Sequence, residues 1–362
     1  MDKNRSSDAC KATFGTKTLI VGGGLSGLAL AEALKAQGRD YVLVEARQRF
    51  GGRILTENFD DGYFDLGPAW FWSGQSRIFG LIDRFNLLKF KQHAEGHLTQ
   101  ENEMGQVKIG RGHSMMEGSW RLVGGLGKLT NLLADQIPDK RKRLNSVVMK
   151  LEKTVQGCIA TLKCGEHIYA DQVVLALPPR IAAKIEFNPP LPTITNDAMT
   201  RIATWMSGQA KAVAVYDTPF WRNQGLSGHA MSRMGPMVEI HDASPHNGGP
   251  YALFGFIGVP PTRRVDEHLL KRHLKAQFVR LFGPEAAKMN ELYVKDWAFD
   301  PQTATQADKD PIYSHPTYGL PEVMTNQFDG ALYFAGAEVA SEFGGYMEGA
   351  LAAAEDVLSV LR

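Results

Sequence analysis

The sequence predicts an α/β fold that begins with a Rossmann-like, dinucleotide-binding unit. Three observations in one stretch near the N-terminus lead to this prediction. A short apolar run from Thr18 to Val21 is typical of a buried strand, and glycines spaced G-x-G-x-x-G follow it. A segment with helical periodicity then runs from Leu25 to Gln37. A second apolar run, Tyr41 to Val44, ends on Glu45, which completes the order of a dinucleotide-binding motif.

The three glycines have separate physical roles in such a motif. Gly22 permits the tight turn out of the first strand, Gly24 lets the backbone approach a pyrophosphate, and Gly27 lets the helix pack closely. Leu25 and Ser26 lie at the start of the helix, where backbone N–H groups and the helix dipole attract phosphate. The alternative is a glycine turn without a ligand, and the strand, helix and acid around this turn argue against it.

Polar residues follow the second strand. Glu45 lies roughly 20 residues past the glycines, at the distance where a carboxylate binds ribose hydroxyls. Ala46 and Arg47 come next, followed by Gly52 and Arg53, so two cations lie where further cofactor phosphates would be. We therefore expect these five residues to contact the cofactor, which on this pattern is either NAD or FAD.

Length and composition limit the possible functions. The 362 residues suit two domains, and a net charge of +1 gives no reason to expect nucleic acid or an acidic membrane as a partner. No stretch approaches the ~18 apolar residues of a membrane span, so we expect no membrane partner. Cys10, Cys158 and Cys164 form neither a metal-ligand spacing nor a disulfide framework, which predicts free thiols and a cytoplasmic protein. The histidines form no ligand cluster, so no metal site is expected.

Two further strings link the chain to a known family. The segment VEARQRFGGRILT, residues 44–56, resembles the E-A-R-x-x-x-G-G-R segment of the flavin-containing amine oxidase family, which includes the monoamine and polyamine oxidases. The segment YFAGAEVASEFGGYMEGA, residues 333–350, is similar to the Y-F-A-G-x-E and G-Y-M-E-G-A pattern of the same family. The string ALPPRIAAKIEFNPPLP, residues 176–192, is also similar. The resemblance implies a short, soluble, bacterial-type member that binds FAD.

The resemblance also implies the domain organisation. We expect a Rossmann-like FAD-binding domain assembled from the discontinuous segments 1–76, 121–200 and 301–362. We expect an α+β substrate-binding domain with a mixed sheet, formed by residues 77–120 and 201–300. Cofactor contacts implied by the resemblance, beyond those above, are Gly67, Pro68, Val148, Gly336, Glu338, Gly345, Tyr346 and Met347.

The resemblance assigns Tyr346 to one wall of a pair of aromatic rings that flank the amine. The position of the second ring falls near Ala307, within residues 303–308, and this stretch has no aromatic residue. It also has no cysteine for a thioether to the flavin, so we predict non-covalent FAD. Trp70 or Trp72 could supply the missing wall, and the alternative is that both are core aromatics. Trp297 is a further predicted site residue.

Lys211 matches a lysine that in this family faces the flavin and holds a water molecule. The spacing from Lys211 to the segment Pro219–Trp221 carries the match, and the alternative is a strand lysine that points into solvent. The role that the resemblance implies is to position water for reoxidation of the flavin by oxygen.

The predicted function is an FAD-dependent oxidase that removes a hydride from the carbon next to an amine nitrogen and gives hydrogen peroxide on reoxidation. The partners would be a small-molecule amine and oxygen, with a monomer or homodimer as the assembly. Two alternatives stay open: a flavin-dependent carbon–carbon desaturase or isomerase of the same fold, and a non-catalytic flavin-binding scaffold.

Periodicity predicts several further elements. Amphipathic helices are expected from Ile78 to Leu88 and from Arg264 to Phe282, the second with Leu269, Leu270, Leu274, Phe278 and Leu281 on one face. A hairpin is expected from Leu144 to Lys163, and a buried parallel strand from Asp171 to Leu177. Lys211 to Tyr216 is expected to form a strand that alternates between buried and exposed positions.

Overall fold

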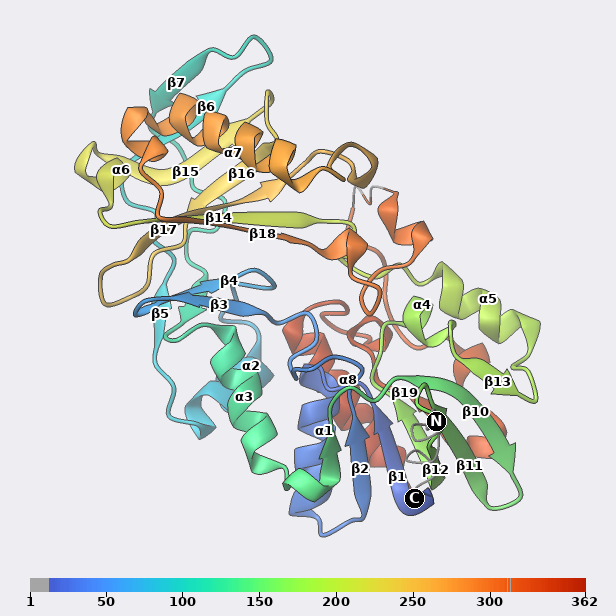
Figure 1. Cartoon of the computed structure of the whole chain (residues 1–362). Helices are drawn as coiled ribbons and strands as arrows, with labels where there is room; N and C mark the ends of the chain where they lie inside the picture. The colour runs from blue at the N-terminus through green and yellow to red at the C-terminus, as the bar shows by residue number, and fades with distance from the viewer. Residues whose placement is uncertain (1–12, 311, 313) are drawn as a thin grey trace, which may run out of the picture. The chain divides into compact units, whose positions relative to one another are not determined.

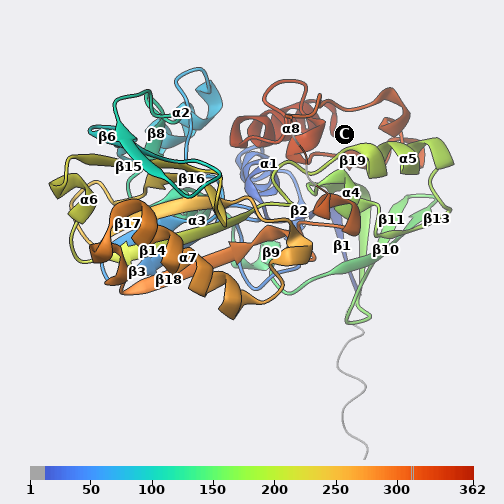
Figure 2. The same cartoon turned by 90° about the horizontal axis from the view of Figure 1, so that it is seen from above.

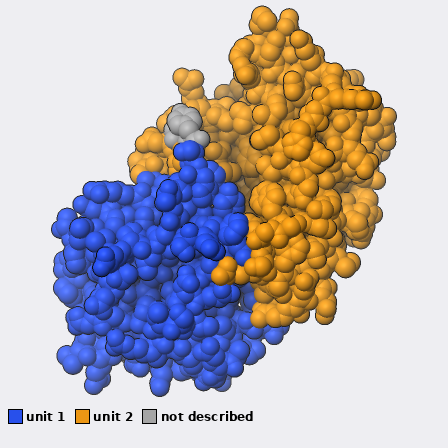
Figure 3. Space-filling view, turned by 180° about the vertical axis from the view of Figure 1, so that it is seen from behind, with its two compact units in different colours: residues 1–53, 130–205, 314–362 blue, residues 54–129, 206–313 orange. Residues whose placement is uncertain are grey.

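The computed structural model describes residues 13–310, 312 and 314–362, so the prediction for Cys10 lies outside the described residues. The chain forms two compact units, coloured separately in Figure 3. The first unit consists of the chain up to Arg53 with Thr130–Trp205 and Ser314–Arg362, and the second consists of Ile54–Leu129 and Met206–Tyr313. Each unit has its own sheet and hydrophobic core.

The bounds of these units differ from those of the predicted domains. Residues 54–76 and 121–129 lie in the second unit, although we expected both stretches in the FAD-binding domain. The physical reason is a pair of contacts between them: the N–H of Leu126 donates to Asp65 at 3.0 Å, and the N–H of Gly127 donates to Thr56 at 2.8 Å. The roles assigned to the two domains stay predictions.

Helices are distributed along the whole chain. Their bounds are α1 Leu25–Ala36, α2 Ser76–Arg84, α3 Leu126–Gln136, α4 Pro179–Ala182, α5 Thr193–Arg201, α6 Phe220–Asn223, α7 Glu267–Phe282 and α8 Met347–Val360.

The sheet of the first unit has the strand order β13-β10-β11-β12-β1-β2-β9, and β19 also pairs with β12. The strand bounds are β1 Thr13–Val21, β2 Tyr41–Val44, β9 Lys142–Arg143, β10 Val148–Thr154, β11 Gly157–Leu162, β12 His167–Leu175, β13 Glu186–Asn188 and β19 Leu332–Phe334.

Parallel strands form the centre of this sheet. The register places Ile20 of β1 beside Leu43 of β2 and Val174 of β12, and all three are fully buried. The same sheet contains the antiparallel hairpin of β10 and β11. The predicted first strand, helix and second strand, the hairpin and the buried parallel strand are therefore confirmed. Helices α1 and α8 pack together beside the sheet, as Figures 1 and 2 show.

The sheet of the second unit has the order β18-β14-β17-β16-β15-β6-β7. It is a mixed sheet, because β15 and β6 are parallel while the other neighbours are antiparallel. Its strand bounds are β6 His97–Glu101, β7 Val107–Gly110, β14 Ala210–Tyr216, β15 Leu226–Ser232, β16 Met237–Asp242, β17 Tyr251–Ile257 and β18 Glu291–Asp296. Two short ribbons complete the strands: β3 Thr56–Phe59 with β4 Gly62–Asp65, and β5 Lys89–Lys91 with β8 Trp120–Leu122.

Both faces of this mixed sheet are covered. Helix α7 runs along one face (Figure 1), where Ala212 and Ala214 of β14 join its apolar cluster. On the other face Val213 and Val215 pack with Trp70. The predicted alternation of β14 is therefore wrong, since all seven positions of the strand are buried.

The two amphipathic helices also differ from the prediction. Helix α2 ends at Arg84, and the chain leaves the helical conformation at Asn86, whose φ is +50°. Helix α7 begins at Glu267, because the side chain of Asp266 caps it by accepting from the N–H of Leu269 at 2.9 Å. Leu269 is 38% exposed, so it does not lie on the buried face with Leu270.

In the described part of the chain, no helix has both the length and the apolar character needed to cross a bilayer.

Candidate functional site

Two glycines of the turn after β1 have no space for a side chain. Gly22 has φ +110°, and a Cβ on it would lie 2.6 Å from the carbonyl oxygen of Ala176. A Cβ on Gly27 would lie 1.9 Å from the carbonyl oxygen of Gly22. Both distances are too short for any side chain, so α1 can pack this closely only with glycine at the two positions.

Gly24 occupies the N-cap position of α1, and no side chain of the described residues caps the helix there. The nearest atom to a Cβ on Gly24 is the Cα of Gly52, at 3.9 Å, so the backbone is open to close approach. The N–H of Gly51 donates to the carbonyl of Gly23 at 2.8 Å, which joins the two glycine segments. An open backbone at an uncapped helix N-terminus fits the pyrophosphate of a dinucleotide such as FAD.

Glu45 stabilises this turn through hydrogen bonds. It is 3% exposed, and its carboxylate accepts from the N–H of Gly23 at 2.7 Å and the N–H of Arg47 at 2.8 Å. The Arg47 guanidinium also lies 3.6 Å from the carboxylate. A carboxylate has about four acceptor sites, so these contacts are compatible with the predicted ribose contact. That contact stays a prediction.

The C-terminal motif lies in the same unit and contacts the N-terminal one. The hydroxyl of Ser26 donates to the carbonyl of Ala335 at 2.5 Å, next to Gly336. Arg53 and Glu338 form a bidentate ion pair, with N–O distances of 2.6 and 3.0 Å. We predicted that both residues contact the cofactor, and no pattern in the sequence indicates that they bind one another. Glu338 is fully buried, so this pair fastens the two motifs together.

Gly345 lies at the start of α8 in a conformation that favours glycine. Its φ is +78°, and a Cβ there would lie 2.9 Å from the Cβ of Trp205. Tyr346 occupies the N-cap position, and Met347 begins the helix and is buried. Trp205 also accepts from Arg53 through its carbonyl at 3.4 Å, so residues of both motifs meet around it.

Tyr346 belongs to an aromatic cluster that the sequence analysis missed. The ring of His315 stacks on Tyr346 with centroids 5.1 Å apart and planes 20° apart. The ring centroid of His315 also lies 4.7 Å from that of Trp205 and 5.3 Å from that of Tyr318. The Nε2 atom of His315 lies 3.0 Å from the carbonyl oxygen of Gly344. One face of Tyr346 is therefore covered by a histidine. No local sequence motif predicts this contact, because the rings come from three separate segments of the chain.

In the second unit, Lys211 is buried rather than exposed to solvent. It is 5% exposed, and its Nζ donates a hydrogen bond to the carbonyl of Gly67. The ammonium lies 5.0 Å from the ring centroids of Phe254 and Phe256. Burial lowers the pKa of Lys211 to about 8, while nearby Asp65 opposes that shift. The alternative of a solvent-facing strand lysine is wrong, and the predicted role stays a prediction.

Trp70 and Trp297 of this unit are buried and hydrogen-bonded, whereas Trp72 is half-buried. The indole N–H of Trp70 donates to Gln92 at 2.8 Å, and Trp70 packs in the apolar cluster with Phe254. The indole N–H of Trp297 donates to the carbonyl of Leu66 at 3.0 Å. These contacts are those of core aromatics, and the role of Trp70 as a second wall for the amine stays a prediction.

The remaining predicted residues have simpler surroundings. Val148 is buried in β10, Pro68 is half-buried beside Gly67, and Ala46 is half-buried after Glu45. Among residues 13–310, 312 and 314–362, no three His, Cys, Asp or Glu side chains are arranged to hold a metal ion. Cys158 is buried, and burial raises the pKa of its thiol to about 11.

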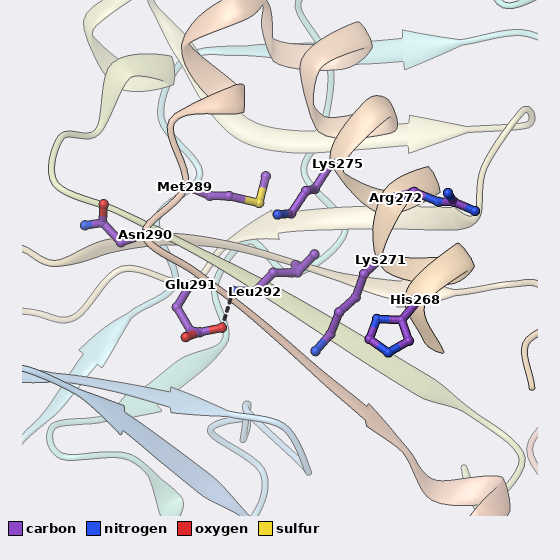
Figure 4. A pocket seen from close by; sticks show the side chains of 8 residues that line it. All are labelled: His268, Lys271, Arg272, Lys275, Met289, Asn290, Glu291 and Leu292. Atoms are coloured by element: carbon purple, nitrogen blue, oxygen red, sulfur yellow. Dashed lines mark hydrogen bonds between the residues drawn. The ribbon is translucent and has the colours of Figure 1, made fainter. Parts of the chain in front are cut away.

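A shallow hollow lies elsewhere in the second unit, between α7 and β18 (Figure 4). Its volume is about 290 Å³, and its cationic lining comes from Lys271, Arg272 and Lys275 on α7. Glu291 lines the opposite side and accepts from the N–H of Leu292 at 2.9 Å. Predicted site residues do not line this hollow, so it is separate from the candidate site.

Comparisons with known proteins agree with this geometry. The sequence profile of the flavin containing amine oxidoreductase family matches two overlapping stretches, residues 25–108 and 102–358. The probable flavin-containing monoamine oxidase A of Dictyostelium discoideum is 23% identical, over 92% of this chain and 94% of that protein. The putative flavin-containing monoamine oxidase AofH of Mycobacterium tuberculosis is 25% identical, over 92% and 93% of the two chains.

A solved structure shows the same fold. Wild-type putrescine oxidase bound to putrescine superposes with a TM-score of 0.79 and 19% identity, covering 96% of this chain and 99% of that chain. Because the family profile spans nearly the whole described chain, the chain belongs to the flavin containing amine oxidoreductase family.

Proposed function

We propose that this protein is an FAD-dependent oxidase of amines. The observation that carries the proposal is the glycine cradle at the uncapped N-terminus of α1, found in a chain of a flavin-containing family. The first backbone N–H groups of a helix have no partner within the helix and attract an anion. At Gly22 and Gly27 the cradle excludes side chains.

The following residues of the first unit would hold FAD. The turn at residues 22–27 would bind the pyrophosphate, Glu45 the ribose, the backbone of Val148 the adenine, and Gly345 with Met347 the flavin end. When bound, FAD accepts a hydride from the carbon next to the amine nitrogen and passes two electrons to oxygen, which gives hydrogen peroxide. Since residues 303–308 include no cysteine, we propose that FAD binds non-covalently.

Two side chains are proposed to act on the substrate and on water. The ring of Tyr346 would orient the amine through its aromatic face. Lys211 would hold a water molecule through its buried ammonium, which has donors left after the bond to Gly67. Burial lowers the pKa of Lys211 to about 8, so near neutral pH the ammonium keeps its proton and its positive charge.

The test is the absorbance spectrum of the purified protein, followed by anaerobic addition of amines. We expect flavin bands that bleach with an amine and return on admission of air with release of peroxide. Acid precipitation should release the yellow colour into the supernatant, and colour retained on the protein would contradict non-covalent binding. A colourless protein that takes up no FAD would overturn the proposal in favour of a scaffold. Bleaching by none of the amines would favour a carbon–carbon desaturase.

We also propose a reducing compartment such as the cytoplasm. The support is the chemistry of Cys158, which is buried and forms no disulfide with another described residue. A monomer or a homodimer is the proposed assembly.

A further inference from the structure

His315 contacts the segment before α8 at two points. Its ring stacks on that of Tyr346, with centroids 5.1 Å apart and planes 20° apart. Its Nε2 lies 3.0 Å from the carbonyl oxygen of Gly344, two residues before Tyr346. Because a carbonyl oxygen only accepts hydrogen bonds, Nε2 carries a hydrogen and donates it. The hydrogen bond and the stacking together hold the imidazole in one orientation against the tyrosine ring.

The position of His315 is itself fixed by two further rings of the first unit. Its ring meets that of Trp205 with planes 62° apart and that of Tyr318 with planes 89° apart. Edge-to-face arrangements of this kind are favoured by the charge distribution of aromatic rings. The hydroxyl of Tyr318 donates to the carbonyl of Ala203 at 2.7 Å, which joins this ring to the segment that carries Trp205.

The residues before Tyr346 do not orient its ring. Gly344 and Gly345 have no side chains that could pack against the tyrosine, and Gly345 has φ +78°. A tyrosine side chain rotates about two bonds, so its neighbours in space must select the orientation of the ring. His315 supplies such a contact over one face of Tyr346.

The exposure of this pair separates it from core packing. His315 is exposed and Tyr346 is half-buried. A stacked pair at the surface removes little apolar area from water, so it adds little to the stability of the fold. A surface pair whose histidine is nevertheless held by a hydrogen bond and by two further rings points to a role in orienting Tyr346.

We propose that His315 is a positioning residue, which holds the ring of Tyr346 by one face and leaves the opposite face to the amine. The inference rests on the proposed function, because it explains how the ring assigned to the amine keeps its orientation. An aromatic face orients an amine only where the ring itself is held at a fixed angle. Residues 303–308 contain no aromatic residue, so the orientation of the amine depends more strongly on Tyr346.

The experiment uses three variants that separate the ring of His315 from its N–H. His315→Ala removes both, His315→Gln keeps an N–H donor for Gly344, and His315→Phe keeps a ring that can stack. With phenethylamine as the substrate, we expect kcat/KM to fall about tenfold in His315→Ala and in His315→Gln. In His315→Phe it should return to within about threefold of the native value. The melting temperature of each variant should stay within about 2 °C of the native value, since the position is exposed.

His167→Ala is the matched control. His167 is an exposed histidine of the same unit, and its Nδ1 lies 3.1 Å from the hydroxyl oxygen of Thr161. This variant also loses an exposed imidazole and one hydrogen bond, but far along the chain from Tyr346. We expect native kcat/KM and a native melting temperature.

A binding measurement separates failure of the positioning role from failure of the proposed function. The probe is benzyltrimethylammonium, a cation that has no N–H and no lone pair on nitrogen. In calorimetric titration of the holoenzymes, we expect native and His315→Phe proteins to bind it alike, and His315→Ala and His315→Gln to bind it about tenfold more weakly. Tyr346→Leu should not bind it. If no amine is oxidised but this pattern holds, the proposed function fails and the positioning role stands.

Four results would overturn the positioning role. The first is a His315→Ala protein with native kcat/KM and native affinity for the probe. The second is recovery in His315→Gln but not in His315→Phe, because the N–H and not the stacked ring would then be required. The third is a loss of activity in His315→Ala that accompanies a large fall in melting temperature, which would indicate a structural role. The fourth is equal binding of the probe to native and Tyr346→Leu proteins when no amine is oxidised.

Discussion

The glycine cradle of the first unit and the surroundings of Lys211 in the second unit are built in opposite ways. The cradle is made of backbone: at Gly22 and Gly27 the structure requires the absence of a side chain. The surroundings of Lys211 are made largely of side chains, because Lys211 of β14 meets the rings of Phe254 and Phe256 of β17. The first kind of site is formed by residues that are adjacent in the sequence, so a local motif predicts it. The second kind of site forms only when the strands pair, so no local motif predicts it.

This difference has a consequence for tolerance to substitution. A backbone-built site fails when a single methyl group is added at the wrong glycine. A side-chain-built site fails when a charge or a hydrogen-bonding group is removed, and its apolar surroundings can stay intact. The effects of substitutions in the two units should therefore differ in size and in kind.

The largest effect is expected for Gly27→Ala in the cradle. The added Cβ would lie 1.9 Å from the carbonyl oxygen of Gly22, so α1 must move away from the sheet. We expect a loss of roughly 4 kcal/mol in the free energy of unfolding and loss of bound FAD. The matched control is Gly15→Ala in β1, where the nearest atom to the Cβ is 4.0 Å away. Denaturant unfolding measures the stability of each variant, and flavin absorbance measures its bound FAD. A Gly27→Ala protein that is stable and yellow would show that the absence of a side chain at this position is not required.

The next effect concerns the ion pair that fastens the two motifs of the first unit. Arg53→Ala leaves the fully buried carboxylate of Glu338 without its bidentate partner. We expect a loss of about 3 kcal/mol, at the low end for buried pairs because Arg53 is a quarter exposed. Arg233→Ala breaks an ion pair with Glu103 in which both side chains are 72% exposed, so its effect on the free energy of unfolding should be far smaller. Equal losses of unfolding free energy in the two variants would show that the buried pair does not stabilise the contact between the two motifs.

The comparison also explains which features could be predicted from the sequence. The first helix and second strand were predicted almost to the residue, because apolar periodicity and glycine punctuation act locally. The alternation predicted for Lys211–Tyr216 failed because an unseen helix and an unseen apolar cluster cover both faces of β14. We predicted that α2 ends at Leu88, but it ends at Arg84. The positive φ of Asn86 belongs to the turn after the helix, and apolar periodicity does not reveal it.

The contacts within the candidate site show the same division. The sequence placed Gly24 and Gly52 near one cofactor, and the structure brings them together. It did not reveal that His315 stacks on Tyr346, because that contact depends on ring packing between distant segments. It also did not reveal the burial of Lys211, since a strand lysine looks the same in sequence whether it faces solvent or a core.

The third effect tests the burial of that lysine through pH. Burial lowers the pKa of Lys211 to about 8, against 10.5 for an ordinary lysine. Between these values the unfolded chain binds a proton that the folded protein has released, so stability rises with pH. Relative to Lys211→Met, the native protein should gain about 2 kcal/mol between pH 8 and pH 10. Denaturant unfolding at both pH values measures the gain.

The control for this pH effect is Lys163→Met, which removes a lysine from an exposed position. Its pH dependence between pH 8 and pH 10 should follow that of the native protein. A Lys211→Met protein with the same pH dependence as the native protein would show that the lysine titrates normally and is solvated.

The smallest effect is expected for Leu269→Ala on α7, at the opposite face of the same sheet. Leu269 is 38% exposed, so Leu269→Ala should change the free energy of unfolding by less than about 0.5 kcal/mol. Leu274 is fully buried in the apolar cluster, and Leu274→Ala should cost about 3 kcal/mol. The sequence analysis put both leucines on one face, although positions five residues apart lie about 140° apart around a helix. In the structure α7 turns Leu274 toward the sheet and leaves Leu269 partly exposed. Equal losses would mean that α7 is turned toward Leu269, which would also alter which residues of β14 it covers.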